Sequence, residues 1–284
     1  MGKRVEVKIG EHLFTPQAIS AHILRKMKRD AEKYFGEPVD QAVITVPAYF
    51  NEASRQATKE AGQIAGFDVL RILNEPTAAA LAYGFGKENG ELVMVIDLGG
   101  GTFDVTILEF SSGVYEVRST SGDTCLGGDD WTAQIAEHIK QKCERELKLT
   151  LSSRPEIKQR MTLAAEAAKI DLTTKLETKI TLPCLEDPKG NLCSFYAHLK
   201  REEFEDITSQ LLERMMTPIQ ATLKDAALSF KDMNKIILVG GATRMPQVRR
   251  KIKDLSGKEP YIDIDPDIVV GLGAAVQAGI LTGE

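Results

Sequence analysis

The sequence predicts a mixed α/β protein in which short buried strands alternate with helices. Apolar runs such as residues 42–46 and 235–239 end at a proline or at glycines, which is typical of buried strands. Between such runs, apolar residues recur at three- and four-residue spacing, as in residues 16–34, which indicates helices packed on one face. Because the two patterns interleave along the chain, α/β is the natural class.

Capping residues set several of the predicted helix boundaries. Asn51 suits the N-cap and Gly66 the C-cap of the second helix, and Pro76 suits the first turn of an alanine-rich helix ending near residue 84. The predicted helices cover residues 16–34, 51–65, 76–83, 129–147, 155–172, 202–228 with a break near Pro218, 245–255 and 268–281.

The predicted strands include a hairpin-like block at residues 92–119, folded around a run of glycines. They cover residues 42–46, 69–73, 92–97, 103–110, 115–119, 180–183, 191–196 and 235–239. An Asp-Pro-Lys-Gly turn is expected at residues 187–190. Residues 131–210 form a helical and hairpin insertion between two strand–glycine units, and we interpret them as a subdomain.

Composition narrows the classes of function. The 284 residues have a net charge of −5, so a broad attraction to nucleic acid or to an anionic membrane is not expected. The sequence has no run of about 18 apolar residues, and its start does not resemble a secretory signal. The four cysteines lack Cys-x-x-Cys spacing and the histidines do not cluster near them. We therefore expect neither a zinc site nor a disulfide framework, and a reducing compartment fits.

The clearest chemical signal is the segment 97–104, Asp-Leu-Gly-Gly-Gly-Thr-Phe-Asp, between two predicted strands. Successive glycines let the backbone approach a phosphate closely, and their N–H groups form an anion-binding nest. Thr102 adds a hydroxyl donor, while Asp97 and Asp104 add carboxylates suited to Mg²⁺. A plain glycine hairpin with acidic flanks is the alternative, but the Asp, Thr and Asp around the glycines favour phosphate binding. The Walker pattern is absent.

Several motifs resemble the DnaK-type, seventy-kilodalton heat-shock chaperones, and the similarity runs from about Phe14 to Gly283, favouring the bacterial or organellar branch. The motifs are VPAYFN at 46–51, RQATK at 55–59, NEPTAAALAYG at 74–84, GDT at 122–124, LGGDD at 126–130 and ILVGGATRMP at 237–246. A sugar kinase of the same superfamily is disfavoured by the segments 46–51 and 74–84, and its catalytic base and sugar contacts have no counterpart that we can place.

This resemblance implies an actin-like, ribonuclease H-like ATPase fold with lobe II complete and lobe I partial. Residues 1–90 would be a remnant of lobe I. Residues 91–284 would form lobe II, with 131–210 inserted and helix 268–281 returning towards lobe I. The family's first phosphate hairpin, its catalytic lysine and its peptide-binding domain have no counterpart here, so we expect an N-terminally truncated ATPase domain.

The resemblance also implies roles for residues around the glycine turn. The turn formed by Gly99, Gly100, Gly101 and Thr102 would grip the β- and γ-phosphates. Asp97 and Asp104 would order Mg²⁺, K⁺ or the attacking water. Glu75 is a candidate for coupling or water activation. The implied cofactors are ATP or ADP with Mg²⁺, with K⁺ as a candidate further ion.

Ribose and adenine contacts are implied for Glu166, Lys169 and Thr173. Their i, i+3 and i+7 spacing would place all three on one helix face, although a surface ion pair has the same spacing. Gly240 and Gly241 would let the nucleoside approach the backbone, and Asp267 resembles a residue lining the pocket. Arg244 would stack on the adenine, because Ile170 stands where many relatives carry arginine.

The implied partners are a J-domain co-chaperone and a nucleotide-exchange factor, in the cytoplasm of a bacterial-type cell or in an organellar matrix or stroma. Pro47 and Arg55 resemble the family's proline switch and relay arginine. Arg71, Asn74 and Thr77 resemble part of the co-chaperone surface, with ordinary exposed polar residues as the alternative.

Two expectations follow from the missing parts. Without the first hairpin and lysine, less charge is neutralised on the γ-phosphate, so we expect poor ATP hydrolysis. The sheet edge beside residues 42–46 would be open, so we expect self-association through it. The resemblance implies the ATP-binding domain of a chaperone ATPase that takes part in stress response and protein folding. The alternative function is a hydrolysis-deficient fragment that only binds nucleotide and co-chaperones.

Overall fold

A computed structural model describes residues 6–84, 90–148, 151, 155–186 and 192–283. These residues form two compact units. The first comprises Met1–Val93, Leu108–Thr120 and Ile268–Glu284, and the second comprises Met94–Ile107 and Ser121–Asp267. The mixed α/β class is confirmed.

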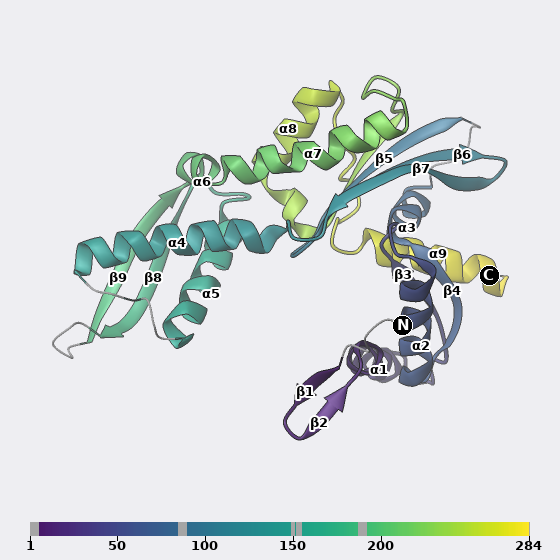
Figure 1. Ribbon diagram of the computed structural model, residues 1–284, viewed down its shortest axis with the longest axis horizontal. Coiled ribbons are helices and arrows are strands. Elements are labelled where there is room, and N and C mark those ends of the chain that lie inside the picture. The colour runs from purple at the N-terminus through teal and green to yellow at the C-terminus, as the bar shows by residue number, and fades with distance from the viewer. Residues whose placement is uncertain (1–5, 85–89, 149–150, 152–154, 187–191, 284) are drawn as a thin grey trace. The chain divides into compact units, whose positions relative to one another are not determined.

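The first unit is built around a parallel strand–helix–strand motif (Figure 1). Strands β3 (Gln41–Val46) and β4 (Asp68–Asn74) pair in parallel, and α2 (Glu52–Ala65) connects them. Gly62 of α2 lies close against this sheet, since a Cβ there would come within 2.6 Å of Val69 Cγ2. Helix α1 (Pro16–Phe35) packs on α2 and follows a short hairpin of β1 (Val7–Ile9) and β2 (His12–Phe14).

Two helices of small residues complete the first unit. Helix α3 (Glu75–Ala82) follows β4 directly, and α9 (Val269–Thr282) packs along it. Three successive alanines of α3, Ala78, Ala79 and Ala80, are fully buried. Because alanine and glycine side chains are so small, the two helix backbones approach each other closely.

A four-stranded sheet carries the glycine turn. Its strand order is β10-β5-β6-β7, with β5 at Glu91–Leu98, β6 at Phe103–Ser111, β7 at Val114–Asp123 and β10 at Lys235–Val239. Strands β5, β6 and β10 supply much of the buried core. Helix α7 (Ser209–Asp225) is tied to this sheet by Thr222, whose hydroxyl lies 3.4 Å from the Val105 carbonyl oxygen.

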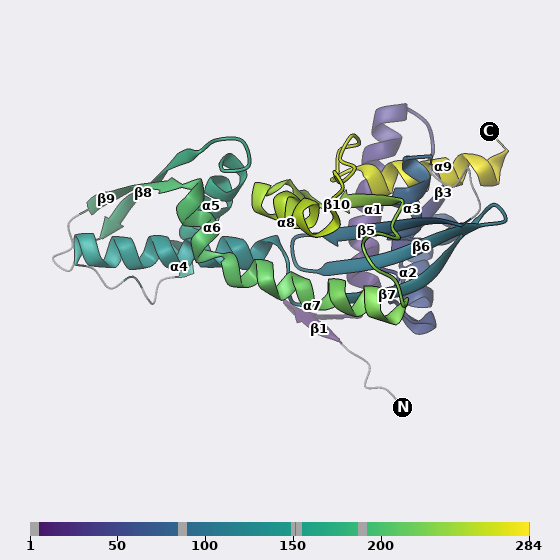
Figure 2. The ribbon, with the colours of Figure 1, turned by 90° about the horizontal axis from the view of Figure 1, so that it is seen from above.

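The second unit also contains a pair of packed helices with a β-hairpin beside them (Figure 2). Helix α4 (Gly128–Leu147) packs on α5 (Pro155–Asp171), and α5 packs on the antiparallel hairpin of β8 (Glu177–Glu186) and β9 (Leu192–Lys200). Trp131 of α4, the only tryptophan of the chain, is fully buried in this core. Helix α6 (Arg201–Ile207), the 3₁₀ turn η1 (Gly241–Arg244) and α8 (Pro246–Ser256) complete the unit.

Several boundary predictions are confirmed, one is wrong, and one short hairpin was not predicted. The side chain of Asn51 caps α2 by accepting from Ser54 N, and Gly66 ends the helix in the left-handed region. The predicted break near Pro218 is wrong, because α7 runs through this buried proline and the interruption falls at Thr208. A proline removes one helix hydrogen bond, and the burial of its ring offsets that loss here. The hairpin of β1 and β2 is too short to give a sequence pattern, and we missed it. The predicted turn at 187–190 lies outside the described residues.

Among the helices that the structure describes, none combines the length and apolarity needed to cross a bilayer.

Candidate nucleotide-binding site

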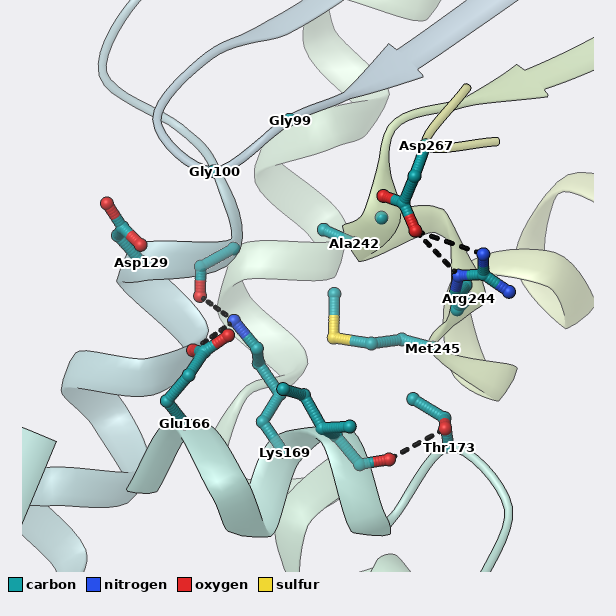
Figure 3. Close-up of a pocket in the computed structure, with 13 residues that line it drawn as sticks. Gly99, Gly100, Asp129, Glu166, Lys169, Thr173, Ala242, Arg244, Met245 and Asp267 are labelled. Atoms are coloured by element: carbon teal, nitrogen blue, oxygen red, sulfur yellow. Dashed lines mark hydrogen bonds and ion pairs between the residues drawn. The ribbon is translucent and has the colours of Figure 1, made fainter. Parts of the chain in front are cut away.

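A cavity of about 390 Å³ opens in the second unit, where three segments distant in sequence meet (Figure 3). The β5–β6 turn and the start of α4 form one wall, α5 forms a second, and η1 with the loop before α9 forms a third. The lining residues are Gly99, Gly100, Gly128, Asp129, Glu166, Lys169, Ile170, Thr173, Gly241, Ala242, Arg244, Met245 and Asp267.

The glycine turn is a tight hairpin that leaves open space above it. Gly99 N donates to Thr102 O at 3.0 Å and closes the turn. None of Gly99, Gly100 and Gly101 has a positive φ, and a Cβ on any of them would meet nothing closer than 3.7 Å. The local fold therefore does not require these glycines. Among the described residues, no hydrogen bond uses the N–H of Gly100 or Gly101, so both remain available to a ligand.

The start of α4 fixes the position of this turn. Gly128 N donates to Gly99 O at 2.9 Å, and Asp129 N donates to Gly100 O at 2.8 Å. A Cβ on Gly127 would overlap the Gly100 carbonyl, so this approach requires glycine. Because the positive end of the α4 dipole lies at the turn, the local field favours an anion there.

An ion pair forms the second wall. Lys169 Nζ lies 2.7 Å from Glu166 Oε2, 2.8 Å from Gly128 O and 2.9 Å from Thr132 Oγ1, so all three ammonium donors are used. Burial raises the pKa of Glu166, but hydrogen bonds from Lys169 and Thr132 outweigh burial, and the net pKa lies below its usual value. Glu166 is therefore a carboxylate at neutral pH, able to accept hydrogen bonds from a ligand.

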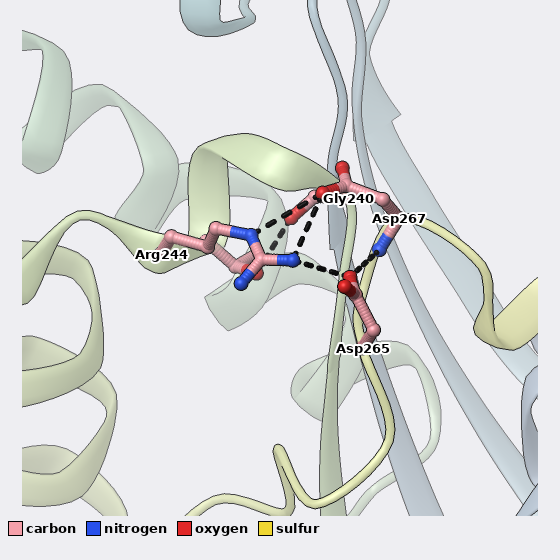
Figure 4. A network of polar contacts seen from close by, with 5 residues as sticks. Gly240, Arg244, Asp265 and Asp267 are labelled. Carbon is pink, nitrogen blue, oxygen red and sulfur yellow. Dashed lines mark hydrogen bonds and ion pairs between the residues drawn. The ribbon is translucent and has the colours of Figure 1, made fainter. Parts of the chain in front are cut away.

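On the third wall, two carboxylates hold the guanidinium of Arg244 (Figure 4). Its Nε and Nη2 donate to Asp267 Oδ2 at 3.2 and 3.0 Å, and Nη2 also pairs with Asp265. The hydrogen bond to Asp267 is the main cause of a raised Arg244 pKa. Figure 3 shows the Arg244–Asp267 pair across the cavity from Glu166 and Lys169.

Glycine is required at position 240, just before η1. Gly240 has φ +86°, and a Cβ there would lie 2.9 Å from Asp97 Oδ1 and would overlap the Leu98 carbonyl. A Cβ on Gly241 would lie 2.6 Å from Asp267 Oδ1. The end of β10 therefore packs backbone to backbone on β5, which brings η1 to the cavity.

Two carboxylates flank the glycine turn, and their oxygens fit Mg²⁺. Asp97 is the next-to-last residue of β5 and Asp104 is the second residue of β6, and both are half-buried. Burial raises the pKa of Asp104 to about 6, although a hydrogen bond from Thr102 opposes the rise. No group of three or more His, Cys, Asp or Glu side chains suited to a metal occurs among the described residues. The donor set therefore suits an ion held partly by phosphate oxygens and water.

The cavity lining brings together eight of the predicted site residues. These are Gly99, Gly100, Glu166, Lys169, Thr173, Gly241, Arg244 and Asp267. Gly101, Thr102, Asp97, Asp104 and Gly240 adjoin the lining without being part of it. Glu75 begins α3 in the first unit.

One detail of the sequence interpretation is wrong. Helix α5 ends at Asp171, so Thr173 does not share a helix face with Glu166 and Lys169. It lies in the following turn, where its hydroxyl donates to Ile170 O at 2.7 Å, and this turn still reaches the cavity.

A family model described as Hsp70 protein matches residues 2–284. The chain belongs to the Hsp70 family. The predicted DnaK-type resemblance is thereby confirmed.

Curated relatives agree with this assignment. "Chaperone protein dnaK" of Cyanophora paradoxa is 50% identical over 99% of this chain and 46% of its own length. "Chaperone protein DnaK" of Halobacterium salinarum is 51% identical over 98% of this chain and 44% of its own. "Chaperone protein dnaK" of Cyanidium caldarium is 49% identical over 95% and 44%. The chain thus spans just under half the length of these relatives.

Sequence reasoning missed several residues that line the cavity of this Hsp70 chain. Gly128 and Asp129 lie within the quoted Leu-Gly-Gly-Asp-Asp motif, but we gave them no role. Ala242 and Met245 also line the cavity and lie within the quoted motif at 237–246, and we gave them no role either. Ala242 directly follows the Gly240-Gly241 pair at the end of β10, whereas Gly128 and Asp129 lie at the start of α4, beyond the end of β7 at Asp123.

A second cavity of about 530 Å³ lies on the first unit of this Hsp70 chain. It is lined by Arg55, Arg71 and Asn74 together with Glu52, Gln56, Lys59, Val69 and Ile72. The guanidinium of Arg55 donates to Phe50 O at 3.0 Å, Ala48 O at 3.3 Å and Asn74 Oδ1 at 2.7 Å. Arg71 donates to Gln277 of α9 at 3.2 Å. Pro47 and Thr77 do not line this cavity.

Proposed function

We propose that this chain is the nucleotide-binding ATPase domain of a DnaK-type chaperone, whose nucleotide state gates peptide binding during protein folding. One observation carries the proposal. The glycine turn, the Glu166–Lys169 pair and the Arg244 clamp line one cavity large enough for a nucleoside with phosphates. The names of the chaperone relatives support the same function.

In the proposed complex, the terminal phosphates bind at the glycine turn. The open N–H groups of Gly100 and Gly101, with the Thr102 hydroxyl, donate to phosphate oxygens. The ribose hydroxyls donate to the Glu166 carboxylate, next to Lys169 and Thr173. The adenine lies between the exposed side chain of Ile170 and the guanidinium of Arg244, above Gly241 and Met245.

Asp97 and Asp104 would hold Mg²⁺ beside the phosphates, directly or through water. The ion supplies charge neutralisation on the γ-phosphate during hydrolysis. Thr102 orients the phosphate, and Glu75 acts in coupling or in activation of the attacking water. K⁺ is a further proposed ion. Poor hydrolysis by this 284-residue chain stays a prediction.

We also propose the actin-like arrangement that the family implies. Residues 1–90 belong to lobe I and 91–284 to lobe II, with 131–210 inserted and residues 268–281 associated with lobe I. The packing of α9 on α3 supports the last assignment.

The first-unit cavity supports a coupling role. Arg55 binds the carbonyls that follow Pro47 and also binds Asn74, so the proposed relay and co-chaperone residues share one hydrogen-bonded cluster. We propose Arg71, Asn74 and Thr77 as J-domain contacts, with a nucleotide-exchange factor as a second partner. Location in a bacterial-type cytoplasm or an organelle stays a prediction.

Calorimetric titration with ADP, with and without Mg²⁺, tests the proposal. We expect saturable 1:1 binding that Arg244→Ala weakens at least tenfold, because the base loses its cationic face. Arg250→Ala is the matched control, since Arg250 pairs with Glu205 and does not line the cavity. No heat of binding at millimolar ADP, or equal loss in both variants, would refute the proposal.

A further inference from the structure

Thr132 lies behind the cavity wall rather than on it. It belongs to the first turns of α4, its exposed fraction is 3%, and it is not among the lining residues. A buried hydroxyl needs hydrogen-bond partners, and those of Thr132 are functional residues.

The Thr132 hydroxyl connects three groups of the site. The hydroxyl oxygen accepts from Lys169 Nζ at 2.9 Å, and the O–H donates to the carboxylate of Glu166, with Gly128 O 3.1 Å from the Thr132 oxygen. A hydroxyl has one hydrogen, and a carboxylate is a stronger acceptor than a carbonyl. The hydrogen therefore points at Glu166.

Removing this hydroxyl would take one hydrogen-bond partner from Lys169 and one from Glu166. Lys169 is only 7% exposed, so the lost acceptor leaves one of its N–H groups buried without a partner. The side chain of Glu166 is 41% exposed and would be held by Lys169 alone. A long carboxylate with one anchor samples more rotamers than one held by two.

We propose that Thr132 is a positioning residue for the nucleotide's ribose, acting through Glu166 and Lys169. The inference rests on the proposed function, in which Glu166 accepts hydrogen bonds from the ribose hydroxyls. Thr132 does not touch the nucleotide. Its hydroxyl presents the Glu166 carboxylate to the sugar in one orientation and keeps the Lys169 ammonium beside it.

A purely structural role would have a different signature. If Thr132 served only to satisfy the core, its loss would weaken binding of every nucleotide equally. If it orients Glu166 towards the sugar, its loss weakens only ligands that carry ribose hydroxyls. ADP and 2′,3′-dideoxy-ADP differ in those hydroxyls alone and separate the two cases.

The experiment compares calorimetric affinities of both nucleotides for the wild-type chain and Thr132→Val, which replaces the hydroxyl with a methyl group of similar size. We expect wild type to prefer ADP. In Thr132→Val, ADP affinity should fall about tenfold, the effect of one hydrogen bond to a charged group. The affinity for dideoxy-ADP should stay within about twofold, so the preference for ADP shrinks.

Two further variants keep the test decisive. Thr132→Ser retains the hydroxyl and should keep the wild-type preference, even if Thr132→Val folds poorly. Thr222→Val removes another buried threonine hydroxyl, in α7, and should leave the preference unchanged.

The outcomes separate this inference from the proposed function. Equal loss of both nucleotides in Thr132→Val, or loss of the preference in Thr132→Ser, overturns the role of Thr132 while leaving nucleotide binding intact. A wild-type chain that binds neither nucleotide overturns both.

Discussion

Gly273 of α9 lies directly against the backbone carbonyl of Ala78 in α3, with no room for a side chain between the two helices. A Cβ placed on Gly273 would overlap that carbonyl oxygen. The contact joins two helices that are distant in sequence, because α9 begins at Val269 and α3 begins 194 residues earlier, at Glu75.

Gly273→Ala should therefore destabilise the chain. The added methyl group must push α9 away from α3, and overpacking of this kind costs about 1–3 kcal/mol. Urea unfolding measures the change. Gly271→Ala is the control on the same helix, because a Cβ there meets nothing within 4 Å. That control should be neutral or stabilising by up to about 1 kcal/mol. Equal effects of the two substitutions would contradict the observed contact.

Arg55→Ala should loosen the segment after Pro47. The guanidinium donates three hydrogen bonds, two of them to carbonyls of this segment, so we expect a loss of about 2 kcal/mol in urea unfolding. Arg55→Lys keeps the charge but not the planar donors, and should recover little of the loss. Lys26→Ala, which breaks an exposed pair with Asp30, should change stability by less than about 0.5 kcal/mol. A lysine variant as stable as wild type would show that the guanidinium geometry is unimportant.

Gly101→Ala should separate binding from stability. A Cβ on Gly101 meets nothing within 4 Å, and the residue has no positive φ, so unfolding should change by less than about 0.5 kcal/mol. If phosphates approach this turn, the new methyl group occupies their space, and ADP affinity should fall at least tenfold by calorimetry. Unchanged ADP affinity would argue against phosphate binding at the turn.

Asp104 should make the stability of the ligand-free chain depend on pH. Burial raises its pKa to about 6, above the ordinary value for aspartate. The folded chain therefore holds this proton more tightly than the unfolded chain does. The resulting stabilisation is complete below about pH 4 and disappears as pH rises through 6. We expect wild type to lose stability relative to Asp104→Asn between pH 4 and 7 in urea titrations. Parallel curves for the two proteins would exclude the shift.

Local chemistry made much of the fold predictable. The caps of α2 at Asn51 and Gly66 follow from side-chain hydrogen bonding and left-handed backbone, which act over a few residues. The predicted helix break at Pro218 was wrong because the outcome there depends on tertiary packing. Burial of the proline ring overrides its local helix-breaking tendency. The hairpin at β1 and β2 has only three residues per strand, too few to show a period.

The site was predictable where its residues form a motif and unpredictable where they act by packing. The glycine turn and Arg244 stand in recognisable segments. By contrast, the contact of Gly127 with Gly100 and the burial of Thr132 depend on how α4 meets the sheet. Self-association through an open sheet edge stays a prediction, and β3 pairs only with β4 among the described strands.

The buried indole of Trp131 gives this protein a built-in optical probe. It is the only tryptophan in the sequence, and it immediately precedes Thr132 in α4. Tryptophan emission from the unlabelled chain, excited where tyrosine does not absorb, therefore reports on one known position beside the cavity. Any rearrangement of the start of α4 can be followed in real time without attaching a dye.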